Sequence, residues 1–171
     1  MNSNMYIIQM RRSKKVWLTT VLALVLPVVA CGPLFIFEEE LGWLPWVIML
    51  LTMTPVYVVT WLYSPQTLML DRNTLTIGRR VQPVEISLGD IRRVERVESK
   101  VVRCAMRTVG NGGLWAYTGR YYHRAVGNYQ LFATELKGLV LIETDNKKYI
   151  ISSVDTIMLR RLQNNDLMRV K

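Results

Sequence analysis

The feature that most constrains this chain is a stretch of 48 residues, 16–63, that contains no lysine and no arginine. Within it, residues 16–37 and 41–63 are uncharged and rich in aliphatic side chains. A helix of either length reaches about 33 Å, which matches a hydrocarbon core of roughly 30 Å. Residues 64–171 are too few to surround two helices that are apolar on every face. The stretch therefore predicts a transmembrane helical hairpin with spans at 16–37 and 41–63.

The charges around the hairpin predict its orientation. Residues 38–40, between the spans, are all glutamate, whereas basic residues flank the hairpin at positions 11, 12, 14 and 15 and at 72, 79 and 80. The positive-inside rule then places the basic N-terminal segment 1–15 and the domain 64–171 on the cytoplasmic side of the membrane. Aromatic side chains favour membrane interfaces. The predicted interface anchors are Trp17, Trp61 and Tyr63 at the inner surface, and Trp43 and Trp46 at the outer surface.

Cys31 allows a second interpretation of the first span. Val28-Val29-Ala30-Cys31 follows a basic segment and an apolar run, so it resembles the cleavage site of a bacterial lipoprotein. Cleavage would make Cys31 a lipidated N-terminus. The chain after Cys31 stays apolar where a lipoprotein usually turns polar, which favours the hairpin. The mass of the mature protein separates the two interpretations. Neither span carries an ionisable residue for a proton or ion relay, so a channel or carrier is not predicted.

From residue 64 onward, short apolar segments alternate with turn residues, which predicts an antiparallel β domain. Gly110, Gly112, Gly113 and Gly119 predict a wide turn or bulge, because no Gly-Lys-Ser/Thr follows them as in a phosphate-binding loop. About seven strands are expected, drawn from residues 68–70, 74–78, 84–88, 91–97, 101–108, 129–133, 139–142 and 149–151.

A helix is predicted to close this domain. Residues 152–155 offer a helix cap, and Asn164-Asn165 offers an end. Val154, Ile157, Met158 and Leu162 recur at helical spacing and form one apolar face. The predicted fold class is therefore α+β: a transmembrane helical hairpin followed by a small antiparallel β barrel or sandwich, capped by a C-terminal helix.

Several segments of residues 64–163 share a recognisable pattern. They are residues 88–91 (LGDI), 107–113 (RTVGNGG), Gly119, 127–129 (GNY), 132–134 (FAT), 148–152 (KYIIS) and Asp155, which opens the helix. In these segments the chain resembles the bacterial pleckstrin-homology (PH) domain family, specifically members tethered by two N-terminal membrane helices. The resemblance implies two near-orthogonal sheets capped by the C-terminal helix and used as a binding or scaffolding module. Members that read phosphoinositides carry several basic residues at the first hairpin turn, whereas residues 71–74 supply only Arg72, so no specific inositol phosphate pocket is expected.

The residue types that carry catalysis are scarce. His123 is the only histidine, and a lone histidine without a partnered cysteine or serine supports neither a catalytic triad nor a zinc site. Cys31 is predicted within the membrane and Cys104 in the cytoplasmic domain, so they cannot pair. Cys104 is expected to be a buried, inert thiol. We therefore predict no enzyme activity, no metal and no cofactor.

Basic residues crowd the middle of the domain. The candidate basic binding face consists of Arg103, Arg107, Arg120 and Arg124. Such a face would attract the anionic lipids of the inner leaflet, at about 1 kcal/mol per basic residue near the surface. A solvated surface, partly neutralised by Glu95 and Glu98, is the alternative. Nucleic acid is not expected as a partner, because no reader motif is present.

The predicted function is a membrane-anchored, non-enzymatic PH-like module at the inner face of a bacterial membrane. It would recruit a membrane or cytoplasmic protein that the sequence does not identify, helped by anionic lipids. The alternative is an accessory subunit of a membrane enzyme or transporter complex. A pull-down in mild detergent separates the two, since the accessory subunit would bring down a stoichiometric large partner.

Overall fold

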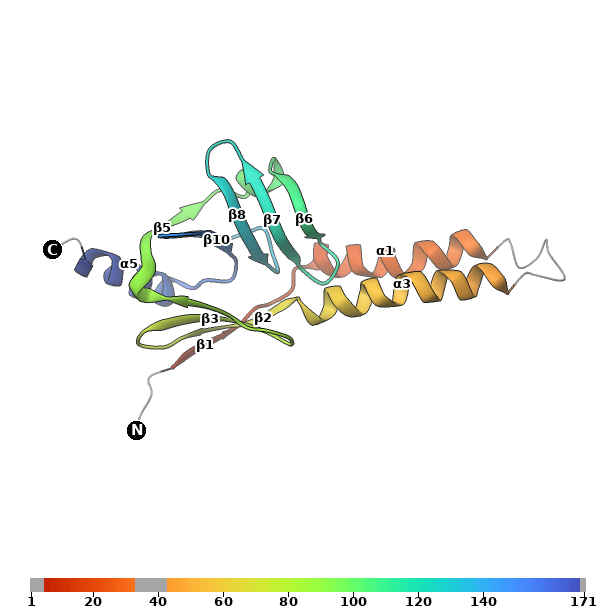
Figure 1. Ribbon diagram of the computed structural model, residues 1–171, viewed down its shortest axis with the longest axis horizontal. Coiled ribbons are helices and arrows are strands. Elements are labelled where there is room, and N and C mark those ends of the chain that lie inside the picture. Colours follow the sequence, from red (N-terminus) through yellow and green to blue (C-terminus); the bar gives the residue numbers. More distant parts are fainter. Residues whose placement is uncertain (1–4, 33–42, 170–171) are drawn as a thin grey trace.

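Two long helices project from a β domain in the computed structural model, which describes residues 5–32 and 43–169 (Figure 1). Helix α1 (Lys14–Cys31) and helix α3 (Leu44–Leu62) lie side by side, and the Tyr57 hydroxyl donates a hydrogen bond to the Ala23 carbonyl. The Ser13 side chain caps α1 by accepting from the Val16 amide at 3.3 Å. The predicted turn at 38–40 lies outside the described residues.

Strand β1 (Tyr6–Gln9) was not predicted by the sequence, in which residues 1–15 are only a basic N-terminal segment. It pairs antiparallel with β2 (Pro65–Leu70), with Tyr6 opposite Leu70. In the structure its four residues alternate between half-buried and exposed positions. Four residues are too few for such an alternation to indicate a strand from the sequence when a long apolar stretch lies next to them. The pairing means that α1 and α3 form an insertion between two neighbouring strands of one sheet.

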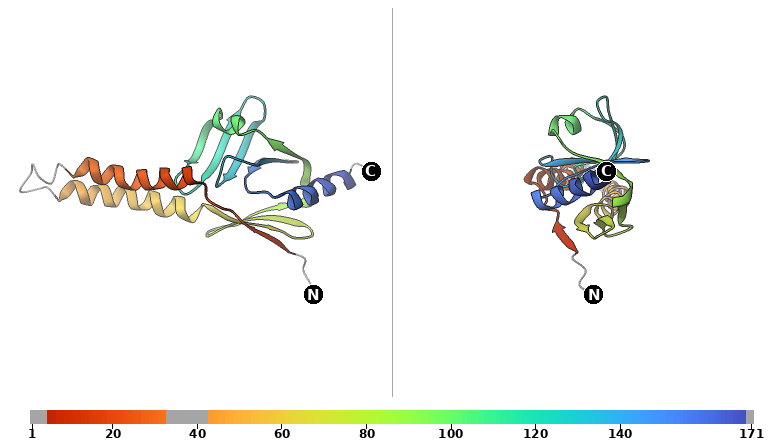
Figure 2. Two further views of the ribbon diagram at one scale, coloured as in Figure 1. Left: turned by 180° about the vertical axis from the view of Figure 1, so that it is seen from behind. Right: turned by 90° about the vertical axis from the view of Figure 1, so that its left-hand side faces the viewer.

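The β domain consists of two packed sheets (Figure 2). The first has the order β1-β2-β3-β4, and the 3₁₀ helix η1 (Leu88–Asp90) leads from it into the second, whose order is β5-β9-β10-β8-β7-β6. The short helix α4 (Ser99–Arg103) joins β5 to β6. The remaining strands are β3 (Thr74–Arg79), β4 (Val84–Ser87), β5 (Ile91–Val97), β6 (Met106–Gly112), β7 (Tyr117–His123), β8 (Gly127–Ala133), β9 (Leu139–Thr144) and β10 (Lys148–Ile151).

Three strand predictions need correction. About seven antiparallel strands were expected, but the described residues form ten, and β10 runs parallel to β8 with Tyr149 opposite Gln130. The strand predicted at 101–108 is interrupted by α4, where Val102 is buried and the basic residues on either side stay exposed. Strand β7 was missed because a glycine and adjacent tyrosines break its alternation.

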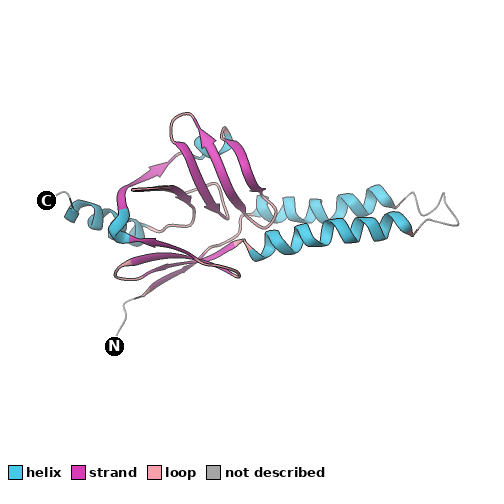
Figure 3. Cartoon of the chain, viewed as in Figure 1, coloured by secondary structure: helices cyan, strands magenta, loops and turns pink. Residues whose placement is uncertain are grey.

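The C-terminal helix α5 (Thr156–Arg169) closes the domain at the end opposite the two long helices (Figure 3). The Asp155 carboxylate caps it by accepting from the Met158 amide at 2.7 Å, whereas the sequence predicted a cap followed by Asp155 as an acid in the first turn. The same carboxylate accepts from the Tyr6 hydroxyl, which ties β1 to α5. The helix continues beyond Asn164-Asn165, where the sequence predicted its end.

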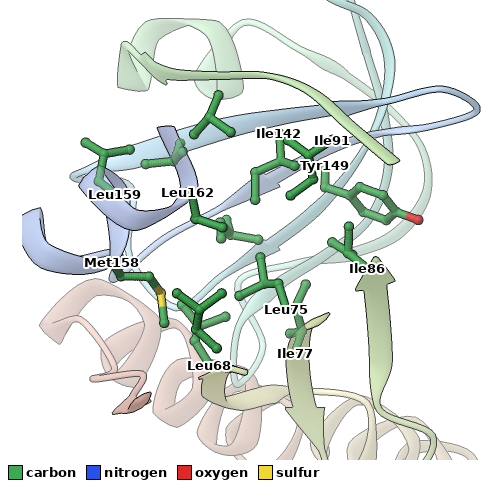
Figure 4. Close-up of a cluster of buried hydrophobic side chains, with 14 of the residues drawn as sticks. Leu68, Leu75, Ile77, Ile86, Ile91, Ile142, Tyr149, Met158, Leu159 and Leu162 are labelled. Carbon is green, nitrogen blue, oxygen red and sulfur yellow. The ribbon is translucent and has the colours of Figure 1, made fainter. Parts of the chain in front are cut away.

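The main core fills the space between the two sheets and α5 (Figure 4). Leu68 and Leu75 of the first sheet face Ile142 of the second, while Met158 and Leu162 of α5 close one end. A second apolar cluster lies on the other face of the second sheet, so this sheet is buried on both sides. Its buried members are Val102, Tyr121, Tyr129, Leu131, Ala133, Leu139, Leu141 and Ile150.

Tyr129 places a polar hydroxyl group in this second cluster. Its hydroxyl is buried, and the described residues give it no hydrogen-bond partner. Burial raises the pKa of Tyr129 to about 12, with a smaller contribution from Tyr121, whose ring is stacked on it at 6.0 Å. The folded state therefore holds the phenolic proton more tightly than the unfolded chain does. The associated stability is present below pH 10 and is lost as the pH rises toward 12.

We expect Tyr129→Phe to leave the free energy of unfolding at neutral pH unchanged or to raise it by up to about 1 kcal/mol, because an unpaired buried hydroxyl is removed. Between pH 10 and 12 the variant should lose less stability than the wild type. Denaturant unfolding at neutral and alkaline pH measures both effects. A variant that is clearly less stable at neutral pH would show that the hydroxyl has a partner.

Candidate functional site

The junction between the two long helices and the sheets is held by buried polar groups. Thr134, at the end of β8, is fully buried, and its carbonyl accepts from the Ser13 amide at 3.1 Å. Its hydroxyl donates to the Arg11 carbonyl at 3.0 Å, and its amide donates to the Ser152 hydroxyl at 2.9 Å. The residues just before α1 are therefore fixed to the ends of β8 and β10.

Thr134→Val should lower the free energy of unfolding by about 1–3 kcal/mol, because the variant keeps the side-chain shape but leaves the Arg11 carbonyl without its partner. Thr144→Val is the matched control. Its hydroxyl donates to the Lys147 carbonyl in an exposed turn, so we expect a loss below about 1 kcal/mol. Thermal unfolding in detergent compares the two variants, and equal losses would contradict this role of Thr134.

Arginine and aromatic side chains surround the junction. Arg80 lies over the Trp61 ring at 3.8 Å, and Arg12 lies over Trp115 at 5.3 Å. Arg79 lies 5.5 Å from the ring centres of Tyr63 and of Phe132. Within the described residues, none of the three arginines forms an ion pair with a carboxylate. We call Arg12, Arg79, Arg80, Trp61, Tyr63 and Trp115 the junction collar.

Burial affects two arginines of the junction collar. It lowers the pKa of Arg12, which the nearby charge of Arg80 lowers further, and it lowers the pKa of Arg79. Like charges held together without a carboxylate attract anions, since field lines concentrate where low-dielectric walls surround one sign of charge. The junction collar is therefore suited to a negatively charged ligand or surface.

The end of the β6–β7 hairpin folds against α1. The Trp115 amide donates to the Thr20 hydroxyl at 3.0 Å, and that buried hydroxyl donates to the Val16 carbonyl at 2.8 Å. The bend behind this contact is made by Gly110 and Gly119, which pair across the hairpin with φ of +130° and +136°. The glycines were expected in a wide turn or bulge, but these two lie within the paired strands.

The four arginines of the predicted basic face lie at different places. Arg107 pairs with Tyr121 across the hairpin, whereas Arg120 pairs with Val109. Because adjacent residues of a strand point to opposite faces, Arg107 and Arg120 lie on opposite faces of the second sheet. The other two lie elsewhere and are exposed: Arg103 ends α4, and Arg124 is in the turn after β7. The predicted face is thus divided between the two sides of the sheet.

The predicted interface anchors fall at the two ends of the helix pair. Trp17 is in the first turn of α1, and Trp61 and Tyr63 lie at the last turn of α3, beside the domain. Trp43 and Trp46 lie at the start of α3, remote from the domain (Figure 1). Four of the five side chains are exposed and Trp46 is half-buried.

The residues considered for catalysis do not form a cluster. The His123 ring accepts from the Ala125 amide at 3.2 Å within a turn. Cys104 is exposed after α4, which corrects the expectation of a buried thiol. In the part of the chain that the structure describes, no group of three or more histidine, cysteine, aspartate or glutamate side chains could hold a metal ion. By length and composition, one described helix, α3, could cross a membrane, and none of its side chains is buried.

Two packed sheets, a helix closing one end and a basic collar at the other define a β-sandwich binding module. The chain belongs to the bacterial PH domain family, because the family model described as a bacterial PH domain matches residues 66–164, more than half of the chain. This confirms the PH part of the resemblance, and the family is generally a non-catalytic module that binds lipids or proteins. No curated protein and no solved structure matches the chain.

Proposed function

We propose that the chain is a membrane-anchored binding module of the bacterial inner membrane. In this proposal α1 and α3 span the bilayer as a hairpin, and the PH domain recruits a protein partner at the cytoplasmic face without catalysing a reaction. The observation that carries the anchoring is the pairing of β1 with β2. It joins the chain before α1 to the chain after α3.

Because of the strand pairing, α1 and α3 must either both cross the membrane or both remain on one side of it. β1 precedes α1 and β2 follows α3, so the chain must return to the side from which it left. A single crossing by α3 would place β1 and β2 on opposite sides of the bilayer. Hence, if α3 crosses the membrane, α1 crosses it in the opposite direction. The exposed aliphatic side chains of both helices are then solvated by lipid.

The ends of the helices support the same arrangement. α3 has 19 residues and a length of about 28 Å, close to the hydrocarbon thickness. Trp61 and Tyr63, with the arginines of the junction collar, then lie at the level of the inner headgroups, where aromatic and basic residues are favoured. The membrane-proximal surface of the PH domain would therefore contact anionic lipids.

Strand β6 supports the recruitment of a protein. It is an edge of the second sheet, so its outer backbone groups can pair with an added strand. Met106 and Val109 on this strand are 69% and 67% exposed. Arg103 and Arg124 are exposed near the same hairpin, so an extended segment that carries acidic residues would complement this edge.

Recruitment is tested by affinity purification of the full chain in mild detergent. The double variant Met106→Glu and Val109→Glu should lose at least about nine-tenths of a bound partner, because the new acids repel an acidic strand. Ile7→Glu is the control, since Ile7 is an exposed apolar residue on the other edge strand, β1. A partner kept equally by all three proteins would contradict recruitment through β6 and would favour the accessory subunit of a larger membrane complex.

Topology is tested by labelling single cysteines introduced at Met5 and at Arg72, in a chain whose two natural cysteines are replaced by serine. Both sites should react with an impermeant thiol reagent only after the inner membrane is opened. Reaction of one site alone in intact spheroplasts would mean an odd number of crossings and would contradict the hairpin.

A further inference from the structure

We infer that a single anionic phospholipid binds in a crevice where α3 meets the two sheets, with its phosphate between Arg79 and Arg120 and an acyl chain along α3. This inference rests on the proposed membrane anchoring, and it names a bound lipid molecule rather than general attraction to the membrane surface. It uses two adjoining cavities at the junction, one with two arginines in its lining and one that runs along the aliphatic side chains of α3.

The first cavity suits the headgroup. Its volume is about 420 Å³, and it lies between the end of β3 and the faces of β6, β7 and β8. Arg79 and Arg120 line it together with the polar side chains of Thr118 and Gln130, and none of the described acidic residues lines it. Neither arginine has an ion-pair partner among the described residues. Guanidinium groups match phosphate with paired hydrogen-bond donors, so a phosphate would fit this lining.

Arg79 is already held in place for such a contact. Its Nε donates to the Gln82 carbonyl at 2.9 Å, and its guanidinium lies against the rings of Tyr63 and Phe132. These contacts fix the side chain, so little conformational entropy is lost when a ligand binds. These contacts supply no negative charge. A half-buried guanidinium without a carboxylate partner is stabilised by a bound anion.

The second cavity suits an acyl chain. Its volume is about 310 Å³, and on the α3 side it is lined by Val56, Val59 and Thr60. The β6–β7 hairpin forms the opposite wall with Leu114, Arg107, Asn111 and neighbouring glycines, so the apolar lining lies on the α3 side. Tyr63, Gly110 and Thr118 line both cavities, so the two adjoin.

The order of the two cavities matches the order of groups in a phospholipid. The cavity that holds Arg79 and Arg120 lies on the domain side, and the second cavity continues along Val59 and Val56 of α3 toward the region where the hydrocarbon core would lie. A free phosphate would occupy only the first cavity and would leave the valine-lined one empty. The second cavity is the reason to assign the site to a lipid.

The test uses the full chain purified in mild detergent and native mass spectrometry. The probes are phosphatidylglycerol and phosphatidylcholine with identical acyl chains, and sn-glycerol 3-phosphate is added as a competitor that has no acyl chain. The variant is Arg79→Gln with Arg120→Gln. The control is Arg72→Gln with Arg96→Gln, which removes the same charge from two exposed residues outside both cavities.

We expect the wild type to retain one phosphatidylglycerol in preference to phosphatidylcholine. The Arg79 and Arg120 variant should bind phosphatidylglycerol at least about tenfold more weakly, because the two charge-assisted contacts to the phosphate are together worth at least that factor. The control should bind as the wild type does. Arg120→Gln alone changes an exposed side chain and keeps the fold, and it should weaken retention severalfold.

Three results would overturn the inference: equal losses in the variant and the control, equal retention of the two lipids, or displacement of the lipid by glycerol phosphate. The last would show a site for a soluble anion. Before detergent is added, membranes from the same cells are washed at alkaline pH. A wild type that remains in the membrane without selecting phosphatidylglycerol overturns the lipid site alone, whereas a wild type that washes off overturns the anchoring as well.

Discussion

Replacing Gly119 with alanine should lower the free energy of unfolding by about 3 kcal/mol or more, the largest effect that we expect from a single added methyl group. Gly119 has φ of +136°, a conformation that other residues rarely adopt. A Cβ atom there would lie 2.2 Å from the Val109 carbonyl oxygen and 2.6 Å from the Gly110 Cα. Both atoms belong to the backbone, so the strands must separate.

Separation of β6 from β7 would also release the hairpin end from α1. The contact of the Trp115 amide with Thr20 depends on this bend, and so does one wall of the lipid crevice. The variant should therefore be less stable and should retain less phosphatidylglycerol.

Gly138→Ala is the matched control for Gly119→Ala. Gly138 has φ of +59°, but a Cβ atom there meets nothing within 4 Å. We expect its loss to stay near 1 kcal/mol, which is the cost of the backbone conformation alone. Thermal and denaturant unfolding in the same detergent compare the two. Equal losses would mean that the close approach of Gly110 and Gly119 is not what the fold requires.

The second large effect is expected at α5. Leu162→Ala should lower the free energy of unfolding by about 2–5 kcal/mol, because Leu162 is fully buried in the main core and its truncation leaves a cavity. It packs with Met158 and Leu159, and together these residues close the end of the sandwich.

Ile157→Ala is the control for Leu162→Ala. It also distinguishes the apolar face of α5 that the sequence predicted from the face that the structure buries. The sequence placed Ile157 on the buried face, but its side chain is 54% exposed, and Leu159 takes its place in the core. We expect a loss below about 1 kcal/mol for Ile157→Ala. If both variants lost the same stability, the helix would be rotated from the position described here.

Local patterns predicted much of the fold. Two long uncharged segments predicted the two helices, and alternation with turn residues located most strands of the PH domain. The start of α5 near Asp155 could be predicted because a helix cap depends on residues only three positions apart. The family could be recognised because its pattern lies in these same local segments.

What could not be predicted depends on contacts between distant residues. The pairing of β1 with β2 joins segments on either side of the helical hairpin. Strands joined by short turns usually pair antiparallel with their neighbours in the sequence, whereas β10 also pairs in parallel with β8. The face to which an arginine points depends on the register shift between Arg107 and Val109. The junction collar was missed for the same reason. Its arginines come from segments as far apart as Arg12 and Arg80 and meet only in the folded chain.

The central claim is that lipid, rather than protein, surrounds α1 and α3. It is tested most directly by washing membranes from cells that produce the full chain with alkaline carbonate, which removes peripheral proteins, and then separating pellet from supernatant. If lipid surrounds the two helices, the protein stays in the pellet and enters solution only with detergent. Recovery of the protein in the carbonate supernatant would contradict it.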